Sequence, residues 1–195
     1  MGHSRDDKAE SHERIVSAAA ARIRESGIDS PGVAEIMRAA GLTHGGFYKH
    51  FANREQLIYE AVEHALRENE AETARVVSGA DDPLAAFADW YVSPAHRDDP
   101  ANGCGVAALG ADVPRVGGPA QESYRAQVER YLGRLQELLA ADDPDARRRA
   151  NVTLSAMVGA LMIARGLGPT DRSDELLRDV LEAIKERRVL PPRGV

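Results

Sequence analysis

The segment GLTHGGFYKHF, residues 41–51, carries side chains that are suited to binding a nucleic acid. It contains three glycines, two histidines, three aromatic residues and one lysine, and it contains no acid. From Ile36 to Arg54 the chain has no acidic residue, whereas Arg38, Lys49 and Arg54 are basic. The phosphate backbone of a duplex favours such a surface. The pattern therefore indicates a local nucleic-acid surface in a chain whose formal net charge is −6.

This segment is expected to form the second half of a helix-turn-helix. The first helix of the motif would cover residues 31–40, and the second would cover 43–51 after a turn at 41–42. Phe47 and Phe51 are four residues apart, so they share one face of the second helix. We expect this aromatic face to point into a small helical bundle.

The opposite face of the second helix then carries the groups that could contact DNA. Gly45 and Lys49 lie on it, Tyr48 lies beside them, and His44 lies in the exposed first turn. Thr43 can cap this helix with its hydroxyl group. A glycine in a helix costs about 1 kcal/mol against alanine, which suggests a reason other than helix stability. Glycine lets the backbone approach base edges, and the first residues of a recognition helix enter the major groove.

A less specific interpretation is a glycine-rich helical turn with a solvated face, because helix-turn-helix patterns give many false positives. An enzyme is disfavoured, because the chain has no phosphate-binding loop, no dinucleotide fingerprint and no convincing metal-ligand spacing. His44 and His50 are six residues apart and do not share a helix face. We therefore expect no catalytic residue, no cofactor and no metal.

The elements that must position these groups are all predicted to be helices, because strict apolar–polar alternation is almost absent. Gly27 is a candidate left-handed C-cap, and Ser30-Pro31 reads as an N-cap followed by the first helical residue. Asn53 is expected to open a further helix, with Gln56 in a variant of the capping box. About nine helices are predicted, at residues 8–26, 31–40, 43–51, 53–77, 83–92, 102–112, 120–141, 145–167 and 174–187.

Two domains are expected within this all-α fold. A three-helix DNA-binding domain with the helix-turn-helix would cover residues 8–66, and a larger helical ligand-binding and dimerisation domain would cover 67–195. The single cysteine, Cys104, excludes an intramolecular disulfide and favours a reducing cytoplasm. No apolar run is expected to reach the roughly 18 residues that a membrane helix needs, and the polar start of the chain is unlike a signal peptide.

The N-terminal part of the chain resembles the tetracycline-repressor (TetR) family of bacterial transcriptional regulators. The resemblance covers ERIVSAAAARIRESGIDSPGVAEIMRAAGLTHGGFYKHFANREQLIYEAV, and its most specific parts are AEIMRAAGLTHGGFYKHF and NREQL. It implies that Thr43, Tyr48, His50 and Arg54 correspond to phosphate-contacting positions. It also implies that His44, Gly45 and Lys49 lie at or next to base-facing positions, with Tyr48 able to touch a thymine methyl group.

Two features depart from the family pattern. Many members have lysine or arginine where this chain has His44, so DNA affinity is expected to be weaker or more dependent on pH. The segment Ser30-Pro31-Gly32 replaces a start of the motif that is usually rich in threonine or serine, so the phosphate contact at that point is not assigned.

The resemblance also implies a homodimer built from the last two long helices. Independently, residues 151–167 are apolar over much of their surface, and Gly159 and Ala160 would let another helix approach closely. Leu176, Leu177, Val180, Leu181 and Ile184 form a second apolar stripe. Two such helices from each of two subunits would make a four-helix interface. The alternative is that both stripes serve only the core of the monomer.

The larger domain of the family usually holds a small-molecule site, so the resemblance implies an unknown effector whose binding releases a repressor from a palindromic operator. The core of the domain is the favoured place for each candidate lining residue taken singly. The candidates are Trp90, Tyr91, Cys104, Tyr124, Tyr131, Met157 and Met162. Asn102 would cap a helix with Cys104 in its first turn, which could lower the thiol pKa. A buried, inert cysteine is the competing reading. The alternative function is an all-α small-molecule-binding or thiol-sensing protein with weak or lost DNA binding.

Overall fold

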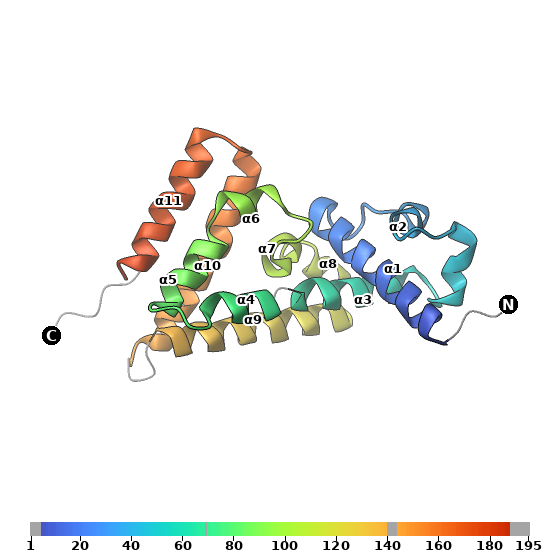
Figure 1. Ribbon diagram of the computed structural model, residues 1–195, viewed down its shortest axis with the longest axis horizontal. Helices are drawn as coiled ribbons and strands as arrows, with labels where there is room; N and C mark the ends of the chain where they lie inside the picture. Colours follow the sequence, from blue (N-terminus) through green and yellow to red (C-terminus); the bar gives the residue numbers. More distant parts are fainter. Residues whose placement is uncertain (1–4, 69, 140–143, 188–195) are drawn as a thin grey trace. The chain divides into compact units, whose positions relative to one another are not determined.

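The computed structural model describes residues 5–68, 70–139 and 144–187, and within them it is built from helices (Figure 1). No strand occurs in these ranges. The all-α architecture is therefore confirmed. The elements are α1 Arg5–Ser26, α2 Val33–Ala39, the 3-10 helix η1 His44–Lys49, α3 Arg54–Arg67, α4 Glu70–Val77, α5 Pro83–Tyr91, α6 Pro94–Asp98, α7 Gly105–Leu109, α8 Val113–Val116, α9 Gly118–Leu138, α10 Ala146–Leu167 and α11 Asp171–Lys185.

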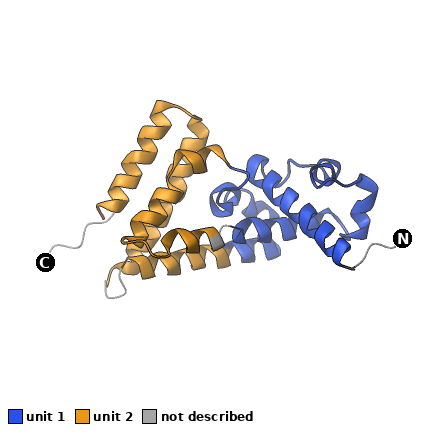
Figure 2. Ribbon diagram, in the orientation of Figure 1, with its two compact units in different colours: residues 1–68, 100–124 blue, residues 69–99, 125–195 orange. Residues whose placement is uncertain are grey.

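The chain forms two compact units (Figure 2). Unit 1 comprises residues 1–68 and 100–124, and unit 2 comprises residues 69–99 and 125–195. This grouping differs from the two expected domains in one respect, because residues 100–124 pack with the N-terminal helices. The expected domain boundary itself stays a prediction.

The core of unit 1 forms where α1 packs against α2, α3 and α7. Ile15, Ala19 and Ile23 recur at every fourth residue of α1 and are fully buried, as that spacing requires of one helix face. Leu57 and Ala61 of α3 are fully buried in the same unit. Gly27 then ends α1 with φ of 87° and donates its backbone N–H to the Ile23 carbonyl at 2.9 Å, which confirms the expected left-handed cap.

The start of α2 differs from the prediction. The N-cap is Gly32 rather than Ser30, and the helix begins at Val33. The Gly32 carbonyl accepts the N–H of Glu35 at 3.0 Å and that of Ile36 at 3.1 Å. Pro31 is buried, and the residue before a proline is disfavoured in helical conformation, so the chain turns here before the helix can form. Gly41, with φ of 73°, ends the helix as expected.

The predicted helix 53–77 begins as expected but is two helices. Asn53 Oδ1 accepts the N–H of Gln56 at 2.8 Å, while Gln56 Oε1 accepts the N–H of Ala52 at the same distance. The capping box is thus displaced by one residue. The helix ends at Arg67 as α3, and α4 begins at Glu70.

The predicted helix 102–112 is shorter than expected, because only α7 lies within it, and the separate short helix α8 follows at Val113–Val116. Asn102 is not the cap, because α7 begins at Gly105 and its N-cap is the fully buried Cys104. A Cβ atom on Gly105 would lie 2.6 Å from the Ala65 carbonyl oxygen, so glycine is what lets α7 rest against α3. The structure also has a short helix that the sequence pattern did not predict. This helix, α6, starts after its N-cap Ser93.

Unit 2 is organised around the pair α10 and α11, which also contacts α6 and α5. The helix α11 begins at Asp171, three residues earlier than predicted, because Thr170 and Ser173 form a reciprocal capping box. The buried guanidinium of Arg97 donates to the Ser173 hydroxyl and to the Asp174 carboxylate, so it ties α6 to the start of α11.

By length and composition alone, α10 is long and apolar enough to cross a membrane. The expectation that no segment would meet this criterion is therefore wrong. The result is weak evidence for a membrane span, because Leu154, Met157 and Leu161 of this helix are buried against the rest of unit 2.

Candidate nucleic-acid interface

The short helix η1 separates an aromatic inner face from a polar outer face. Phe47 is buried and stacks on the buried Phe51 with ring centroids 5.5 Å apart. This confirms the predicted aromatic side. The helix is 3-10 rather than α, and Thr43 occupies the N-cap position without a side-chain hydrogen bond, so the expected hydroxyl cap is wrong. The Thr43 carbonyl instead accepts the N–H of Gly46 at 3.0 Å.

The outer face presents Thr43, His44, Gly45, Tyr48 and Lys49, all of which are exposed. Tyr48 keeps 76% of its surface exposed, an uncommon state for so large a ring. Within the described ranges, neither His44 nor Lys49 has an ion-pair or hydrogen-bond partner. A Cβ atom on Gly45 would meet nothing within 4 Å, so internal packing does not demand glycine here. The face is therefore open, and the backbone at Gly45 can be approached closely by another molecule.

The Arg54 side chain already forms hydrogen bonds within the protein. Its Nη2 donates to the Ile28 carbonyl at 2.9 Å and to the Asp29 carbonyl at 3.5 Å. These bonds hold the loop before α2 against the first turn of α3. A guanidinium has five N–H donors, so Arg54 keeps donors that could contact a phosphate. That contact stays a prediction.

His50 is a predicted interface residue that is less exposed than Tyr48 and Lys49. Its ring is half-buried, and its Nδ1 atom is buried without a hydrogen-bond partner in the described ranges. Burial lowers the pKa of His50, and the nearby positive groups His12, Lys8 and Lys49 lower it further. The imidazole is therefore neutral over most of the physiological range, and a phosphate contact would be a neutral hydrogen bond.

The residues predicted to line an effector site are divided between the two units, and their role as ligand contacts stays a prediction. Cys104 and Tyr124 belong to unit 1, where the Tyr124 hydroxyl donates to the Val106 carbonyl at 3.1 Å. The others belong to unit 2, where they take different environments. Tyr91 and Met157 are in the core, Trp90 is half-buried, Met162 is exposed, and Tyr131 lines a cleft.

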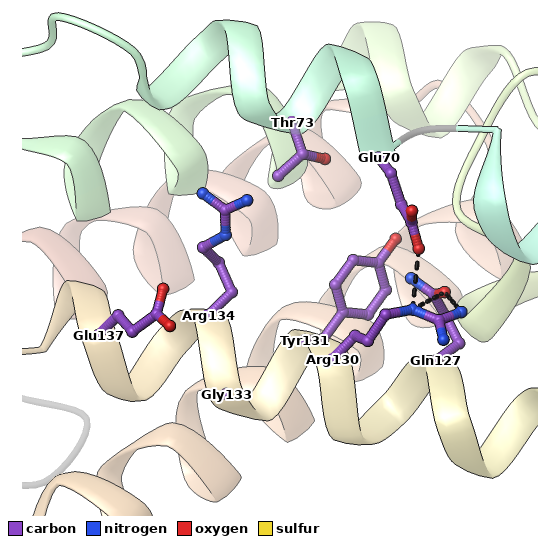
Figure 3. A pocket seen from close by; sticks show the side chains of 8 residues that line it. All are labelled: Glu70, Thr73, Gln127, Arg130, Tyr131, Gly133, Arg134 and Glu137. Atoms are coloured by element: carbon purple, nitrogen blue, oxygen red, sulfur yellow. Dashed lines mark hydrogen bonds and ion pairs between the residues drawn. The ribbon is translucent and has the colours of Figure 1, made fainter.

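That cleft has a volume of about 320 Å³ and lies between α4 and α9 (Figure 3). Its lining includes polar side chains that the aromatic-based prediction missed, chiefly Gln127, Arg130 and Arg134 of α9 and Thr73 of α4. Positions 127, 130, 131 and 134 recur at helical spacing, so they share one face of α9. This spacing was visible in the sequence, but it does not indicate whether the face is covered.

Comparison with known proteins decides the family. The sequence model described as bacterial regulatory proteins, tetR family, matches residues 15–61, which contain the whole helix-turn-helix. The uncharacterized HTH-type transcriptional regulator Rv0196 of Mycobacterium tuberculosis (strain ATCC 25618 / H37Rv) is 30% identical over 187 residues, with 88% of this chain and 94% of the relative covered. The chain belongs to the TetR family.

Solved structures support the same assignment. A TetR transcriptional regulator from Chloroflexus aurantiacus J-10-FL has a TM-score of 0.80 at 25% identity, covering 93% of this chain and 97% of that one. SCO4454, a TetR-family transcriptional regulator from Streptomyces coelicolor, shares the fold with a TM-score of 0.74 at 23% identity and covers 98% of both chains. This TetR-family chain is therefore a helix-turn-helix transcriptional regulator, a class that is generally not enzymatic.

Proposed function

We propose that this protein is a ligand-responsive repressor that works in the cytoplasm as a homodimer, binds a palindromic operator and is released by a small molecule. The observation that carries the proposal is the outer face of η1. It is exposed, carries no acid and has no internal partner for its lysine within the described residues.

In this proposal the outer face of η1 enters the major groove. Lys49 and His44 contact bases or phosphates at the tip, and Gly45 lets the backbone approach the base edges. Tyr48 contributes a hydroxyl for phosphate and a ring face for a thymine methyl group. Thr43, His50 and Arg54 flank this tip and contact the phosphate backbone.

A second copy of the chain is proposed to cover the exposed face of α10. Met162, Ile163 and Leu167 on this face keep 46%, 55% and 43% of their surfaces exposed. Gly159 and Gly166 lie on the same side, and a Cβ atom on either would meet nothing within 4 Å. Apolar side chains beside small residues favour close packing of two helices. A dimer also gives two reading heads, which palindromic half-sites one helical turn apart require.

The proposed effector acts by shifting a population. It must bind the conformer that does not fit DNA more tightly than the conformer that does, because equal affinity shifts nothing. The cleft between α4 and α9 is the site we propose for it. This scheme gives Cys104 no sensor role, because its side chain is fully buried.

Selection of bound fragments from random duplexes, followed by fluorescence anisotropy at several salt concentrations, tests the DNA-binding part of the proposal. The expected result is an enriched palindrome, bound with an affinity that falls steeply with salt because phosphate contacts release counterions. If no duplex is bound even at low salt, the chain is instead a helical small-molecule-binding protein that has lost DNA binding.

A further inference from the structure

The cleft in unit 2 is built from two helices that face each other across it (Figure 3). The helix α4 contributes Glu70 and Thr73, and α9 contributes a polar face that runs from Gln127 to Glu137. Its volume of about 320 Å³ is at the low end of the range for small-molecule sites, which is about 300–1,000 Å³. The cleft therefore suits a small ligand with a few strong polar contacts.

Gln127 is fully buried and supplies an unused hydrogen-bond donor to this cleft. Its Oε1 accepts from Nε of Arg130 at 3.0 Å and also from Nη2 of Arg130. An arginine side chain only donates, so the amide oxygen must face Arg130 and the amide nitrogen must face away from it. That Nε2 atom is buried and has no acceptor in the described part of the chain. A buried donor without an acceptor costs free energy, which a ligand oxygen would recover.

Arg134 brings an uncompensated positive charge to the same cleft. It is half-buried, and within the described ranges no carboxylate pairs with it. The other arginine, Arg130, is already neutralised by Glu70 at 2.8 Å. Glu137 lies three residues after Arg134 in α9, but it is exposed and forms no ion pair with Arg134. The cleft thus offers one amide donor and one guanidinium, which lie on either side of Tyr131 (Figure 3).

We propose that this cleft binds a small organic carboxylate that carries a second oxygen group, with the Arg134 guanidinium pairing with the carboxylate and Gln127 Nε2 donating to the second oxygen group on the other side of Tyr131 (Figure 3). Guanidinium and carboxylate match in geometry and form charge-assisted hydrogen bonds, whereas an alcohol, amide or amine gains less from this pair. The inference rests on the proposed function only in taking the carboxylate as the effector. The binding site itself stands on the geometry of unit 2.

The first experiment measures binding by calorimetry on the purified protein without DNA. The probes are the dicarboxylates succinate, glutarate and adipate, each compared at about 10 mM with its diamide and its diamine. We expect at least one dicarboxylate to bind and its diamide and diamine to bind at least roughly tenfold more weakly. Equal binding of the diamine, or no binding by any of the three dicarboxylates, would overturn the proposal.

Three variants then locate the site. Gln127→Glu keeps an oxygen towards Arg130 but replaces the unpartnered donor with a second carboxylate oxygen, and it should abolish carboxylate binding. Arg134→Gln should weaken binding at least roughly tenfold. Arg125→Gln is the matched control, because Arg125 is an exposed arginine of the same helix that does not line the cleft. Circular dichroism and thermal midpoints verify that each variant is folded.

The outcomes separate this proposal from the proposed function. Wild-type carboxylate binding by folded Gln127→Glu or Arg134→Gln would show that the cleft is not the site. Carboxylate binding that leaves the affinity for the selected duplex unchanged would keep the site and overturn its role as the effector site. Failure to bind any duplex, with carboxylate binding intact, would overturn only the proposed repressor.

Discussion

At the scale of single residues, two kinds of side chain stand apart in this chain. Lys49 is a charge that the protein leaves unused, because it is exposed and has no partner among the described residues. His96 is a titratable group that is buried in the folded protein. Each has a consequence that a single substitution can measure.

Lys49→Ala is expected to weaken DNA binding roughly tenfold and to reduce the slope of log affinity against log salt by about 1, because one phosphate contact is lost. Anisotropy titrations with the selected duplex at several salt concentrations provide the measurement. Lys185→Ala is the matched control, since Lys185 lies in α11 and pairs with Asp89 at 2.7 Å. An unchanged salt slope in Lys49→Ala would remove this lysine from the interface.

Acidification is expected to destabilise the protein through His96. The pKa of this imidazole is lowered from 6.5 to about 4, chiefly by burial and also by the charge of Arg165, while the hydrogen bond with the Tyr91 carbonyl and the charge of Asp99 oppose the shift. Because the unfolded chain takes up the proton first, stability is lost as the pH falls from about 6.5 to about 4. The shift corresponds to roughly 3 kcal/mol.

His96→Asn isolates this contribution, because the amide can still donate to the Tyr91 carbonyl but does not titrate. The thermal midpoint of the wild type should fall more between pH 7 and pH 5 than that of the variant. Parallel pH profiles for the two proteins would mean that His96 is not responsible.

At the scale of elements, α7 depends on one close contact. Gly105 lets the start of this helix lie against α3, since a Cβ atom there would come within 2.6 Å of the Ala65 carbonyl oxygen and 2.9 Å of its carbon. Backbone atoms cannot rotate away as a side chain can. The buried Arg24 side chain secures the same region with a bond of 2.5 Å to the Ala101 carbonyl and an ion pair of 2.6 Å with Glu68.

Gly105→Ala is therefore expected to lower the free energy of unfolding by about 1–3 kcal/mol. Gly133→Ala is the control, because its Cβ atom would meet nothing within 4 Å. In the interior of α9 that change should stabilise the protein by up to about 1 kcal/mol. Urea unfolding followed by circular dichroism measures both. Equal stability of the two variants would contradict the predicted clash.

At the scale of the whole molecule, the question is what covers the exposed face of α10. Ile163→Glu places a charge at its centre and is expected to convert the proposed dimer to a monomer, because burying an unpaired carboxylate costs several kcal/mol. Analytical ultracentrifugation measures the oligomeric state. When dimerisation is lost, the affinity for a palindromic duplex should also fall, because a monomer has one reading head and contacts only one half-site.

Val116→Glu is the control for this experiment. Val116 is also an exposed apolar residue, but it lies in α8 of unit 1. This variant should keep the oligomeric state of the wild type. A monomeric wild type, or a dimer that survives Ile163→Glu, would contradict the proposed interface.

Local chemistry was enough to predict the features that depend on a few neighbouring residues. The spacing of Phe47 and Phe51 determined the inner face of η1, and the glycine at 27 and the asparagine at 53 determined a helix end and a helix start. These outcomes follow from backbone freedom and helical periodicity, which act over one or two turns. The helix-turn-helix was therefore accessible from the sequence, whereas its contacts with DNA stay predictions.

The tertiary structure decided what depends on residues far apart in the chain. Residues 100–124 pack with the N-terminal helices because Gly105 fits the backbone of Ala65 and Asp112 accepts the N–H of Ile28 at 3.0 Å. From the sequence alone, the polar face of α9 would be interpreted as solvated surface. In the structure α4 lies opposite this face. A sequence fixes which face of a helix is polar, but only packing determines whether that face meets water, another helix or a ligand.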